Sequence, residues 1–307
     1  MGSVTGGQCF HGRERRTALS FWQSGPAPLR VVSELRLGLS FARERGLAES
    51  RYGFIGFVDD DNWVGPDWVS NAYDVLSADS RLGAVGSICD PVYEAPPPEW
   101  FHNFHTSFAI LTDHDLQQMP QPPDFLNGAG LCIRRIAWEK LAENGFRFQL
   151  TDRVGKGLSA GGDTELTLAL GLAGWKLRVE RRLRLQHFMP SQRLQWKYLR
   201  KLLRNYCASQ VLLDAYSIHS LSLRPGFRRW LSDRWWYQFG KCLTTIKSRP
   251  SAVMAALLSD GEAREDVIEI EKQFGRALGL LQFSRRYGAL RCEIRDAGWR
   301  MTAERVA

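Results

Sequence analysis

Three consecutive carboxylates, Asp59 to Asp61, follow directly on the apolar residues 54–58. An apolar run bounded by polar residues is typical of a buried strand that ends at the protein surface. In open α/β sheets, ligands bind beyond the carboxyl ends of such strands. Clustered carboxylates repel one another unless a cation lies between them, and Mg²⁺ or Mn²⁺ takes oxygen ligands that it often shares with substrate phosphates. The stretch therefore predicts a metal–diphosphate site, and its structural alternative is an acidic turn that closes a strand.

The elements around this stretch alternate between strand and helix. By their hydrophobic period, strands are expected at residues 29–32, 54–58, 84–89, 131–133, 175–179 and 183–187, and helices at residues 36–49, 66–78, 136–144 and 166–172. This alternation predicts an α/β fold with a mostly parallel sheet. Residues 90–127 have no regular period, and a segment of this length in a compact domain is usually functional. Helical periods with interleaved apolar and basic residues follow at 196–218, 228–247 and 262–286.

The composition of the 307 residues is that of a globular protein, with 44% hydrophobic and 24% charged residues. The net charge of +8 favours an anionic partner such as a nucleotide, a nucleic acid, lipid head groups or a phosphorylated substrate. The six cysteines are scattered without a C-x-x-C pair, as expected for free thiols in a reducing compartment. The sequence has no apolar run long enough to cross a bilayer and no signal-peptide core, so a cytoplasmic protein, soluble or peripheral on a membrane, is expected.

Five short motifs follow one another along residues 31–204. They lie at residues 38–46, which contain Ala42 and Arg43; at Asp59 to Asp61; at residues 127–130, with Arg134 or Arg135 after them; at residues 161–166, around Asp163; and from His187 to Arg193. In this order they resemble the G-x-x-x-A-R-N-x-G, D-x-D, acceptor-side glycine-rich, G-E-D-x-E-L and H-x-x-P-x-x-R motifs of the family 2 glycosyltransferases. The resemblance implies an inverting nucleotide-sugar enzyme of GT-A fold, and it is greatest for enzymes of bacterial polysaccharide biosynthesis.

On the donor side, the resemblance implies a divalent metal and a set of nucleotide contacts. The metal, Mn²⁺ or Mg²⁺, would be held by Asp59, Asp61 and His187, and the nucleotide sugar by Arg43, Asp59, Asp60 and Arg193. Each of three side chains has a structural alternative: a surface salt bridge for Arg43, a satisfied structural histidine for His187, and an ordinary basic surface residue for Arg193.

On the acceptor side, the resemblance implies that Asp163 is the general base that takes the proton of the acceptor hydroxyl. The alternative is that Asp163 caps the N-terminus of the helix after it. The acceptor would lie against Gly128, Ala129 and Gly130, where glycine lets the backbone approach a sugar closely, or these residues form a plain turn. Glu165 would contact the acceptor or lie on the helix surface.

Two departures from the family pattern affect these expectations. Residues 1–30 contain nothing like the family's first strand or the acidic residues that hold the base and ribose of the nucleotide. We therefore expect an irregular tail at residues 1–28, a GT-A core at residues 29–205 that is incomplete at its N-terminus and binds UDP weakly with little activity, and a helical region at residues 206–307. The second departure is Gly162, at a position where an acidic residue usually precedes the base. With no membrane helices, a non-processive enzyme is expected.

Ten lysines or arginines between Trp175 and Arg204 are accompanied by a single acid, Glu180. They indicate a solvated basic face, a nucleic-acid site, or a surface for anionic lipid or a lipid-diphosphate acceptor. The sequence carries no nucleic-acid-binding motif, whereas nearby tryptophans and tyrosines suit a membrane interface. The predicted function is transfer of a sugar from a nucleotide donor, expected to be a UDP-sugar, to a glycan or lipid-linked acceptor in polysaccharide biosynthesis. The alternatives are a catalytically impaired GT-A remnant and a basic membrane-surface or nucleic-acid-binding protein.

Overall fold

The computed structural model describes residues 3–8, 20, 22, 27–152, 160–217, 225–258 and 261–301. The strands are β1 (Ser3–Gln8), β2 (Leu29–Glu34), β3 (Phe54–Gly56), β4 (Asn62–Val64), β5 (Leu82–Tyr93), β6 (Cys132–Arg134) and β7 (Lys176–Met189). The helices of the α/β part are α2 (Leu39–Glu49), α3 (Trp68–Ala78), α4 (Phe101–Phe104), η1 (His105–Phe108), α5 (Asp113–Gln118), α6 (Arg135–Glu143) and α7 (Gly162–Leu172). They are followed by η2 (Ser191–Leu194), α8 (Trp196–Leu213), η3 (Asp214–Tyr216), α10 (Phe227–Ser232), α11 (Trp235–Lys247), α12 (Pro250–Leu257), α13 (Glu265–Gln282) and α14 (Ser284–Arg295).

The main sheet has the strand order β3-β6-β5-β7-β4 and is mixed. Strands β5 and β7 pair in parallel, while β3–β6, β5–β6 and β4–β7 pair antiparallel. The α/β class and the helical C-terminal region are confirmed, and the sheet is mixed because its long central pair is parallel and its short strands are antiparallel. Hydrophobic period locates a strand without giving its direction, and the short strands β4 and β6 return antiparallel beside the long pair.

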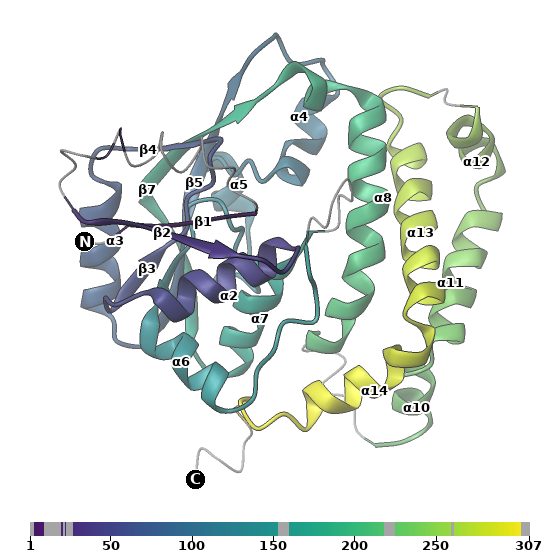
Figure 1. Cartoon of the computed structure of the whole chain (residues 1–307). Coiled ribbons are helices and arrows are strands. Elements are labelled where there is room, and N and C mark those ends of the chain that lie inside the picture. The colour runs from purple at the N-terminus through teal and green to yellow at the C-terminus, as the bar shows by residue number, and fades with distance from the viewer. Residues whose placement is uncertain are drawn as a thin grey trace.

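The carboxyl ends of β3, β5 and β7 lie at one edge of this sheet. Residue Cys132, at the start of β6, is paired with both Gly56 and Val85, and His187 is paired with Asn62. Residues 57–61 therefore form the connection between β3 and β4 at this edge. Helix α7 precedes β7 and packs on it, so its N-terminus lies toward the same edge (Figure 1). The acidic residues and the start of α7 are thus brought together.

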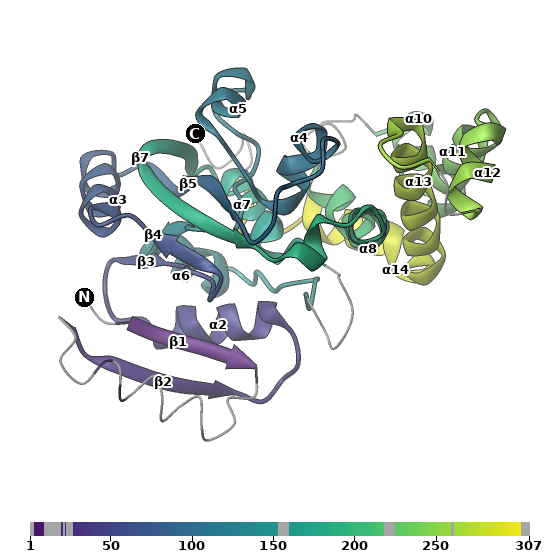
Figure 2. The same ribbon diagram turned by 90° about the horizontal axis from the view of Figure 1, so that it is seen from above.

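The N-terminal segment contains a strand that was not expected. Residues 3–8 form β1, which pairs in parallel with β2, and α2 packs on both strands. Figure 2 shows α2 between this two-stranded ribbon and the rest of the α/β part. The prediction of an irregular tail is therefore wrong for residues 3–8, and most of residues 9–28 lie outside the described residues. The stretch from Ser3 to Gln8 contains two glycines and no apolar alternation, so only its pairing with β2 reveals it as a strand.

Helix α8 joins the α/β part to the C-terminal helices. It packs against α13, and α13 packs against α11, so these helices form successive layers beside the sheet (Figure 1). The predicted boundary at residue 205 falls inside α8, which is continuous from Trp196 to Leu213. No helix in the described ranges is long and apolar enough to cross a membrane.

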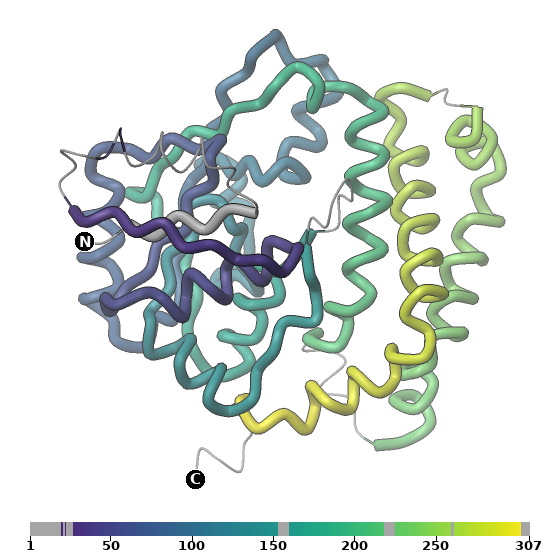
Figure 3. The backbone as a smooth tube through the Cα atoms, viewed as in Figure 1, coloured from purple at the N-terminus to yellow at the C-terminus, as the bar shows by residue number. Residues whose placement is uncertain are grey.

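The end of the described chain returns to the α/β part. After α14 the backbone passes back beneath α8 toward α6, as the tube in Figure 3 shows. There the ring of Trp299 lies against Phe146 and Tyr216, with ring centroids 5.7 and 6.1 Å apart. The C-terminal helices are therefore fastened to the core at both ends, through α8 and through Trp299.

Candidate active site

The connection between β3 and β4 places Asp61 beside two residues from the end of β7 and the helix after it. Asp61 Oδ2 accepts a hydrogen bond from Arg193 at 3.0 Å and lies 3.4 Å from Nε2 of His187. Arg193 also lies 3.2 Å from His187 Nε2. The same ring nitrogen of His187 therefore faces both the guanidinium of Arg193 and the carboxylate of Asp61. The structure thus brings together Asp61, His187 and Arg193, three of the residues predicted from the sequence.

These partners change the acidity of Asp61. Burial works against the charged form, but the hydrogen bonds and charges of His187 and Arg193 outweigh it and lower the pKa of Asp61 to about 2. Asp61 Oδ1 also accepts a hydrogen bond from the side-chain amide of Asn62 at 2.9 Å. Asp61 is therefore a carboxylate at neutral pH, held in one orientation by three neighbours.

The residues of this cluster fit a divalent cation. Asp61 supplies a carboxylate oxygen, the ligand that Mn²⁺ and Mg²⁺ prefer, and the 7%-exposed His187 supplies a softer imidazole nitrogen. Within the described ranges, no three or more His, Cys, Asp or Glu side chains gather as a metal site. A metal here would therefore draw its other ligands from water and substrate phosphate, which is the usual arrangement for magnesium in phosphate-handling enzymes.

Asp59 and Asp60 open the same turn. The backbone carbonyl of Asp59 accepts a hydrogen bond from the Asn62 N–H at 3.1 Å, and this bond closes the turn. The side chain of Asp60 is exposed, and that of Asp59 is partly buried. Burial, together with the charges of Asp90, Asp61 and Asp59, raises the pKa of the nearby Cys89 thiol to about 12. The individual roles of Asp59 and Asp60 stay predictions.

A second cluster forms around Gly128. The carboxylate of Asp163 accepts hydrogen bonds from the Gly128 N–H at 2.5 Å and from the Thr164 N–H at 2.9 Å. A Cβ atom on Gly128 would lie 2.8 Å from Asp163 Oδ2 and 2.9 Å from a terminal nitrogen of Arg43. Gly128 therefore provides the space in which the carboxylate of Asp163 and the guanidinium of Arg43 face one another. Three residues predicted from separate motifs meet at this point.

Asp163 lies in the first turn of α7 and does not cap the helix. Helix α7 begins at Gly162, and its N-cap is Gly161, which has a φ of 128° that favours glycine. A carboxylate in the first turn is stabilised by the helix dipole and by unpaired backbone N–H groups. The capping alternative for Asp163 is therefore wrong, and its side chain remains partly exposed.

Two of the predicted acceptor residues are enclosed by protein. Ala129 is 7% exposed, and Gly130 is buried with a φ of 65°. The Gly130 carbonyl accepts a hydrogen bond from Ser87 Oγ at 2.7 Å, and Ser87 Oγ in turn accepts one from the indole of Trp68 at 2.9 Å. These contacts explain both residues as parts of a tight turn, so direct acceptor contact is not supported for Ala129 or Gly130.

Glu165 contradicts both roles expected from the sequence. Its side chain is fully buried, and its carboxylate accepts hydrogen bonds from the backbone N–H groups of Gln149 and Leu150 and from the hydroxyl of Tyr216. Burial raises the pKa of Glu165 to about 7, although these hydrogen bonds act in the opposite direction. Glu165 therefore fastens the segment before α7 to η3 and lies neither on the helix surface nor against an acceptor.

The two clusters are joined by a short stretch of backbone. Leu131, three residues after Gly128, accepts a hydrogen bond from the Phe57 N–H at 2.8 Å. Phe57 lies two residues before Asp59, at the start of the acidic turn. Three residues span at most about 10 Å, so the Gly128 cluster and the acidic turn lie at the same edge of the sheet.

Asp152 is a residue of this region that sequence reasoning missed. It is 2% exposed, and its carboxylate accepts a hydrogen bond from the Gly162 N–H at 2.6 Å and forms an ion pair with Arg43 at 3.2 Å. Arg43 is itself 9% exposed, so the surface salt bridge considered for it is a buried one. An isolated aspartate between Thr151 and Arg153 belongs to no motif, and nothing in the sequence distinguishes it.

The basic stretch between Trp175 and Arg204 is largely engaged in ion pairs. Acids from distant segments pair with Arg181, Arg184, Arg193, Arg200 and Arg204, and Arg182 pairs with Glu180. The fully buried Glu271 of α13 takes both Arg200 and Arg204 of α8. Much of the basic charge in this stretch is therefore balanced by acids that lie far away in the sequence.

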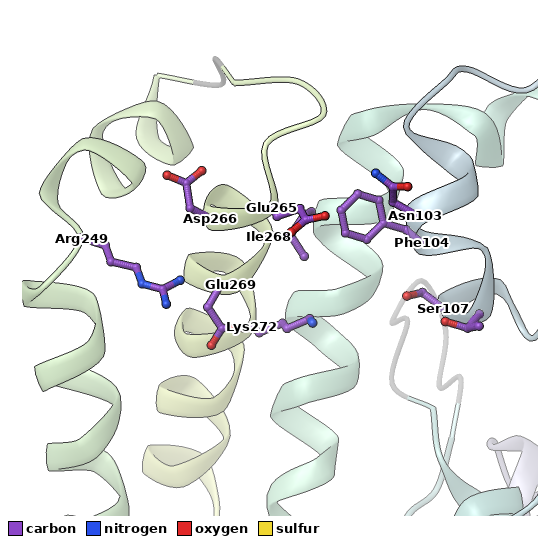
Figure 4. A pocket seen from close by; sticks show the side chains of 10 residues that line it. Asn103, Phe104, Ser107, Arg249, Glu265, Asp266, Ile268, Glu269 and Lys272 are labelled. Carbon is purple, nitrogen blue, oxygen red and sulfur yellow. The ribbon is translucent and has the colours of Figure 1, made fainter. Parts of the chain in front are cut away.

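A cavity of about 760 Å³ lies between the α/β part and the C-terminal helices. Its walls are formed by α4 and η1 on one side and by α13 with Arg249 on the other (Figure 4). The described residues that line it include none of the site residues predicted from the sequence. The candidate active site is therefore the edge of the sheet that carries Asp61 and Asp163, and not this cavity.

Residues 17–140 match the model of the family described as glycosyl transferase family 2. The chain is similar to solved structures of GalNAc-T7 with UDP, GalNAc and Mn²⁺ (14% identity, TM-score 0.43, 73% of this chain and 45% of that one) and of the mannosyltransferase PcManGT from Pyrobaculum calidifontis with GDP-Man and Mn²⁺ (14%, 0.45, 95% and 64%). It is also similar to S. aureus TarS (14%, 0.40, 68% and 34%). It spans less than two thirds of the length of each of these proteins. No curated protein sequence matches the chain.

Proposed function

The chain belongs, through residues 17–140, to glycosyl transferase family 2, and from this membership we propose that it moves a sugar from a nucleotide-diphosphate donor to a hydroxyl group of a glycan or lipid-linked acceptor. The α/β core and the family match agree with the GT-A fold expected from the motifs. The observation that supports this function most directly is the convergence of Asp163, Gly128 and Arg43 at the sheet edge that also carries Asp61 and His187.

On the donor side, Asp61 and His187 hold the divalent metal, Mn²⁺ or Mg²⁺, and Asp59 and Asp60 contact the nucleotide sugar. The metal, when bound, neutralises the negative charge that develops on the departing diphosphate. Arg193, already within hydrogen-bond distance of Asp61, turns toward a diphosphate oxygen. Arg43 supplies a second guanidinium, which lies with the Asp163 carboxylate beside Gly128. The proposed donor is a UDP-sugar.

On the acceptor side, Asp163 is the general base. The N–H groups of Gly128 and Thr164 fix the carboxylate, which is partly exposed and so remains reachable by a hydroxyl group. Asp163 takes the hydroxyl proton as the acceptor oxygen forms a bond to the anomeric carbon. The bond from this carbon to the diphosphate breaks with its electron pair on the nucleotide. A single displacement of this kind inverts the configuration at the anomeric carbon.

Two substitutions test this assignment. Asp163→Asn is expected to lower turnover of a UDP-sugar by roughly 10²-fold or more, the contribution of a positioned general base, while UDP affinity measured by calorimetry stays unchanged. Asp61→Ala is expected to abolish the effect of Mn²⁺ on UDP affinity. Full turnover by the Asp163→Asn protein, or unchanged Mn²⁺-dependent UDP affinity in the Asp61→Ala protein, would contradict the roles given to these residues.

The acceptor is proposed to be presented at a membrane, with the protein bound peripherally to the inner face of the cell membrane. This proposal is supported by an aromatic cluster of Phe227, Trp230 and Trp236, which are 73%, 46% and 48% exposed. Neighbouring rings in this cluster lie 5.8 and 6.2 Å apart, on the outer layer of the C-terminal helices. Exposed aromatic rings among basic residues are typical of proteins that bind anionic lipid surfaces. Sedimentation with anionic vesicles tests the contact.

A further inference from the structure

The carboxylate of Asp152 connects two parts of the candidate site. One partner is the Gly162 N–H, at 2.6 Å, which is the first backbone donor of α7. The other partner is the guanidinium of Arg43 in α2, at 3.2 Å. The next residue of α7 is Asp163, and the second terminal nitrogen of Arg43 lies beside Gly128. A single buried carboxylate therefore fixes both groups that meet across Gly128.

Asp152 is itself held rigidly by the start of α2. Its backbone carbonyl accepts a hydrogen bond from the Leu39 N–H at 3.0 Å, and that of Thr151 accepts one from the Ser40 N–H at 3.5 Å. Its φ is 45°, in the left-handed region that aspartate tolerates better than most residues. Because the backbone is fixed at this point, the direction of the carboxylate toward α7 is also fixed.

The space that this carboxylate fills is left by the absence of a side chain at residue 162. A Cβ atom on Gly162 would lie 2.5 Å from Asp152 Oδ2 and 2.6 Å from Ser40 Oγ. The φ of Gly162 is outside the left-handed region, so the backbone there would accept another residue if the space were free. A side chain at residue 162 and the carboxylate of Asp152 therefore exclude one another.

We propose that Asp152 is a positioning residue for sugar transfer, because from ten residues upstream its carboxylate fills the space left by the missing side chain of Gly162 and binds the first N–H of α7 and Arg43. It orients Arg43 and the first turn of α7 so that the guanidinium and the carboxylate of Asp163 face the same reacting centre. Removing it leaves the guanidinium of Arg43 without its buried counter-charge and the first N–H of α7 without its acceptor. This inference rests on the proposed function, since the groups that Asp152 positions are those of the transfer reaction.

Exchange of the two residues tests the proposal. Asp152→Gly removes the carboxylate without straining the backbone, because glycine accepts a positive φ. Gly162→Asp introduces a side chain that collides with Asp152. Each single variant is expected to lower kcat for a UDP-sugar by at least about 10-fold, and the double variant is expected to recover to within a few-fold of the original protein. Asp152→Asn keeps an acceptor for the Gly162 N–H and loses the charge, so its kcat is expected to lie between that of Asp152→Gly and that of the original protein.

A matched control separates positioning from stability. Asp233, which pairs with the buried Arg291 and Arg295 among the C-terminal helices, is replaced by alanine. This variant is expected to lower the melting temperature while kcat, measured well below that temperature, stays unchanged. For Asp152→Gly, kcat is expected to fall more than KM changes, at a temperature where the variant is folded.

The outcomes are distinguishable. If neither the original protein nor any variant turned over a nucleotide sugar, the proposed function and this inference would both be overturned. Loss of turnover in Asp163→Asn, with full kcat in Asp152→Gly, would overturn this inference alone. Failure of the double variant to recover kcat, although its melting temperature recovers, would contradict the exchange, because a carboxylate at residue 162 would then restore folding without orienting Arg43 and Asp163.

Discussion

At the residue scale, the carboxylates of this chain differ in environment far more than their sequence contexts suggest. Asp163 and Glu165 are two residues apart, yet one is partly exposed at the site and the other is fully buried beneath it. Residues two apart on a helix project to nearly opposite sides. The sequence pattern placed the helix start at Leu166, whereas it lies at Gly162. Because the start was set four residues late, the opposite directions of the two side chains were not predicted.

The other site residues could be predicted one by one, but their contacts with one another could not. The sequence indicated Arg43, Gly128 and Asp163 by motif, but their contact depends on bringing together segments separated by tens of residues. Asp152 could not be predicted, because its importance comes from the missing side chain at Gly162 and from its contact with Arg43. Short motifs show which residue types are present, whereas the partners that orient them depend on the packing of α2 against α7.

The first prediction at this scale concerns Gly128. In Gly128→Ala the added methyl group would displace either the Asp163 carboxylate or the Arg43 guanidinium, which lie 2.8 and 2.9 Å from its position. Turnover of a UDP-sugar is expected to fall by about 10²-fold, the effect of misplacing a reacting group by an ångström. Gly171→Ala in the same helix as Asp163 is the control, since its methyl group would make an ordinary contact of 3.9 Å with Leu177. Equal turnover in the two variants would contradict the role of Gly128.

The second prediction concerns the pH dependence of stability through Glu165. Its pKa is raised from 4.5 to about 7 in the folded protein, so the folded state binds more protons than the unfolded state between these values. The stability that this proton binding adds to the folded state, about 3 kcal/mol, is present in full below pH 4.5 and is lost as the pH rises through about 7. Glu165→Gln is expected to remove this part of the pH dependence. The measurement is the free energy of unfolding in urea from pH 4 to 8, and parallel curves for the two proteins would contradict the prediction.

At the element scale, helices α8 and α13 approach one another through glycine. Cβ atoms on Gly275 and Gly279 of α13 would lie well inside van der Waals contact with the backbone carbonyls of Arg204 and Ala208 in α8. The same face carries the buried Glu271, whose carboxylate takes Arg200 and Arg204. The periodicity of the sequence predicted both helices, but it gave no sign that their backbones touch, because a glycine has no side chain to mark a face.

The third prediction follows from this contact. In Gly275→Ala the methyl group meets backbone, which cannot rotate away, so α13 must move from α8 and strain the Glu271 ion pairs. The free energy of unfolding is expected to fall by about 1–3 kcal/mol, the usual cost of overpacking. Gly240→Ala in α11 is the matched control, because nothing lies within 4 Å of its Cβ position. This control is expected to raise stability by about 1 kcal/mol through helix propensity alone. A stabilising effect of Gly275→Ala would exclude the close contact.

At the scale of the whole molecule, the net charge of +8 is a poor guide to where a partner binds. Arginines near the sequence centre are balanced by acids of other segments, and Glu271 and Asp61 take several of them. The outer layer of C-terminal helices is different, because Arg228 of α10, Arg234 between α10 and α11, and Lys241 of α11 have exposed side chains. The side chains of Arg234 and Lys241 lie over the rings of Trp230 and Tyr237, at 4.8 and 4.7 Å from their centroids. Cations and aromatic rings therefore share one surface here.

The last prediction concerns this surface. The protein is expected to sediment with vesicles that contain anionic phospholipid and to remain in solution with neutral vesicles, because rings insert at the interface while cations meet the head groups. Replacing Arg228 and Arg234 by glutamine should weaken binding about 5-fold for each charge removed, on the basis of about 1 kcal/mol per cation near an anionic surface.

The aromatic cluster is tested separately. Replacing Phe227, Trp230 and Trp236 by alanine together should abolish sedimentation with anionic vesicles. The control replaces Tyr52 and Tyr73 by alanine, since these rings are 53% and 57% exposed on the α/β part and are expected to take no part. Equal binding by both multiple variants would place the contact elsewhere on the molecule. If the charge variants lost binding and the aromatic variant kept it, the interaction would be electrostatic attraction alone. Added salt should then abolish binding at concentrations where the Debye length falls to a few ångströms.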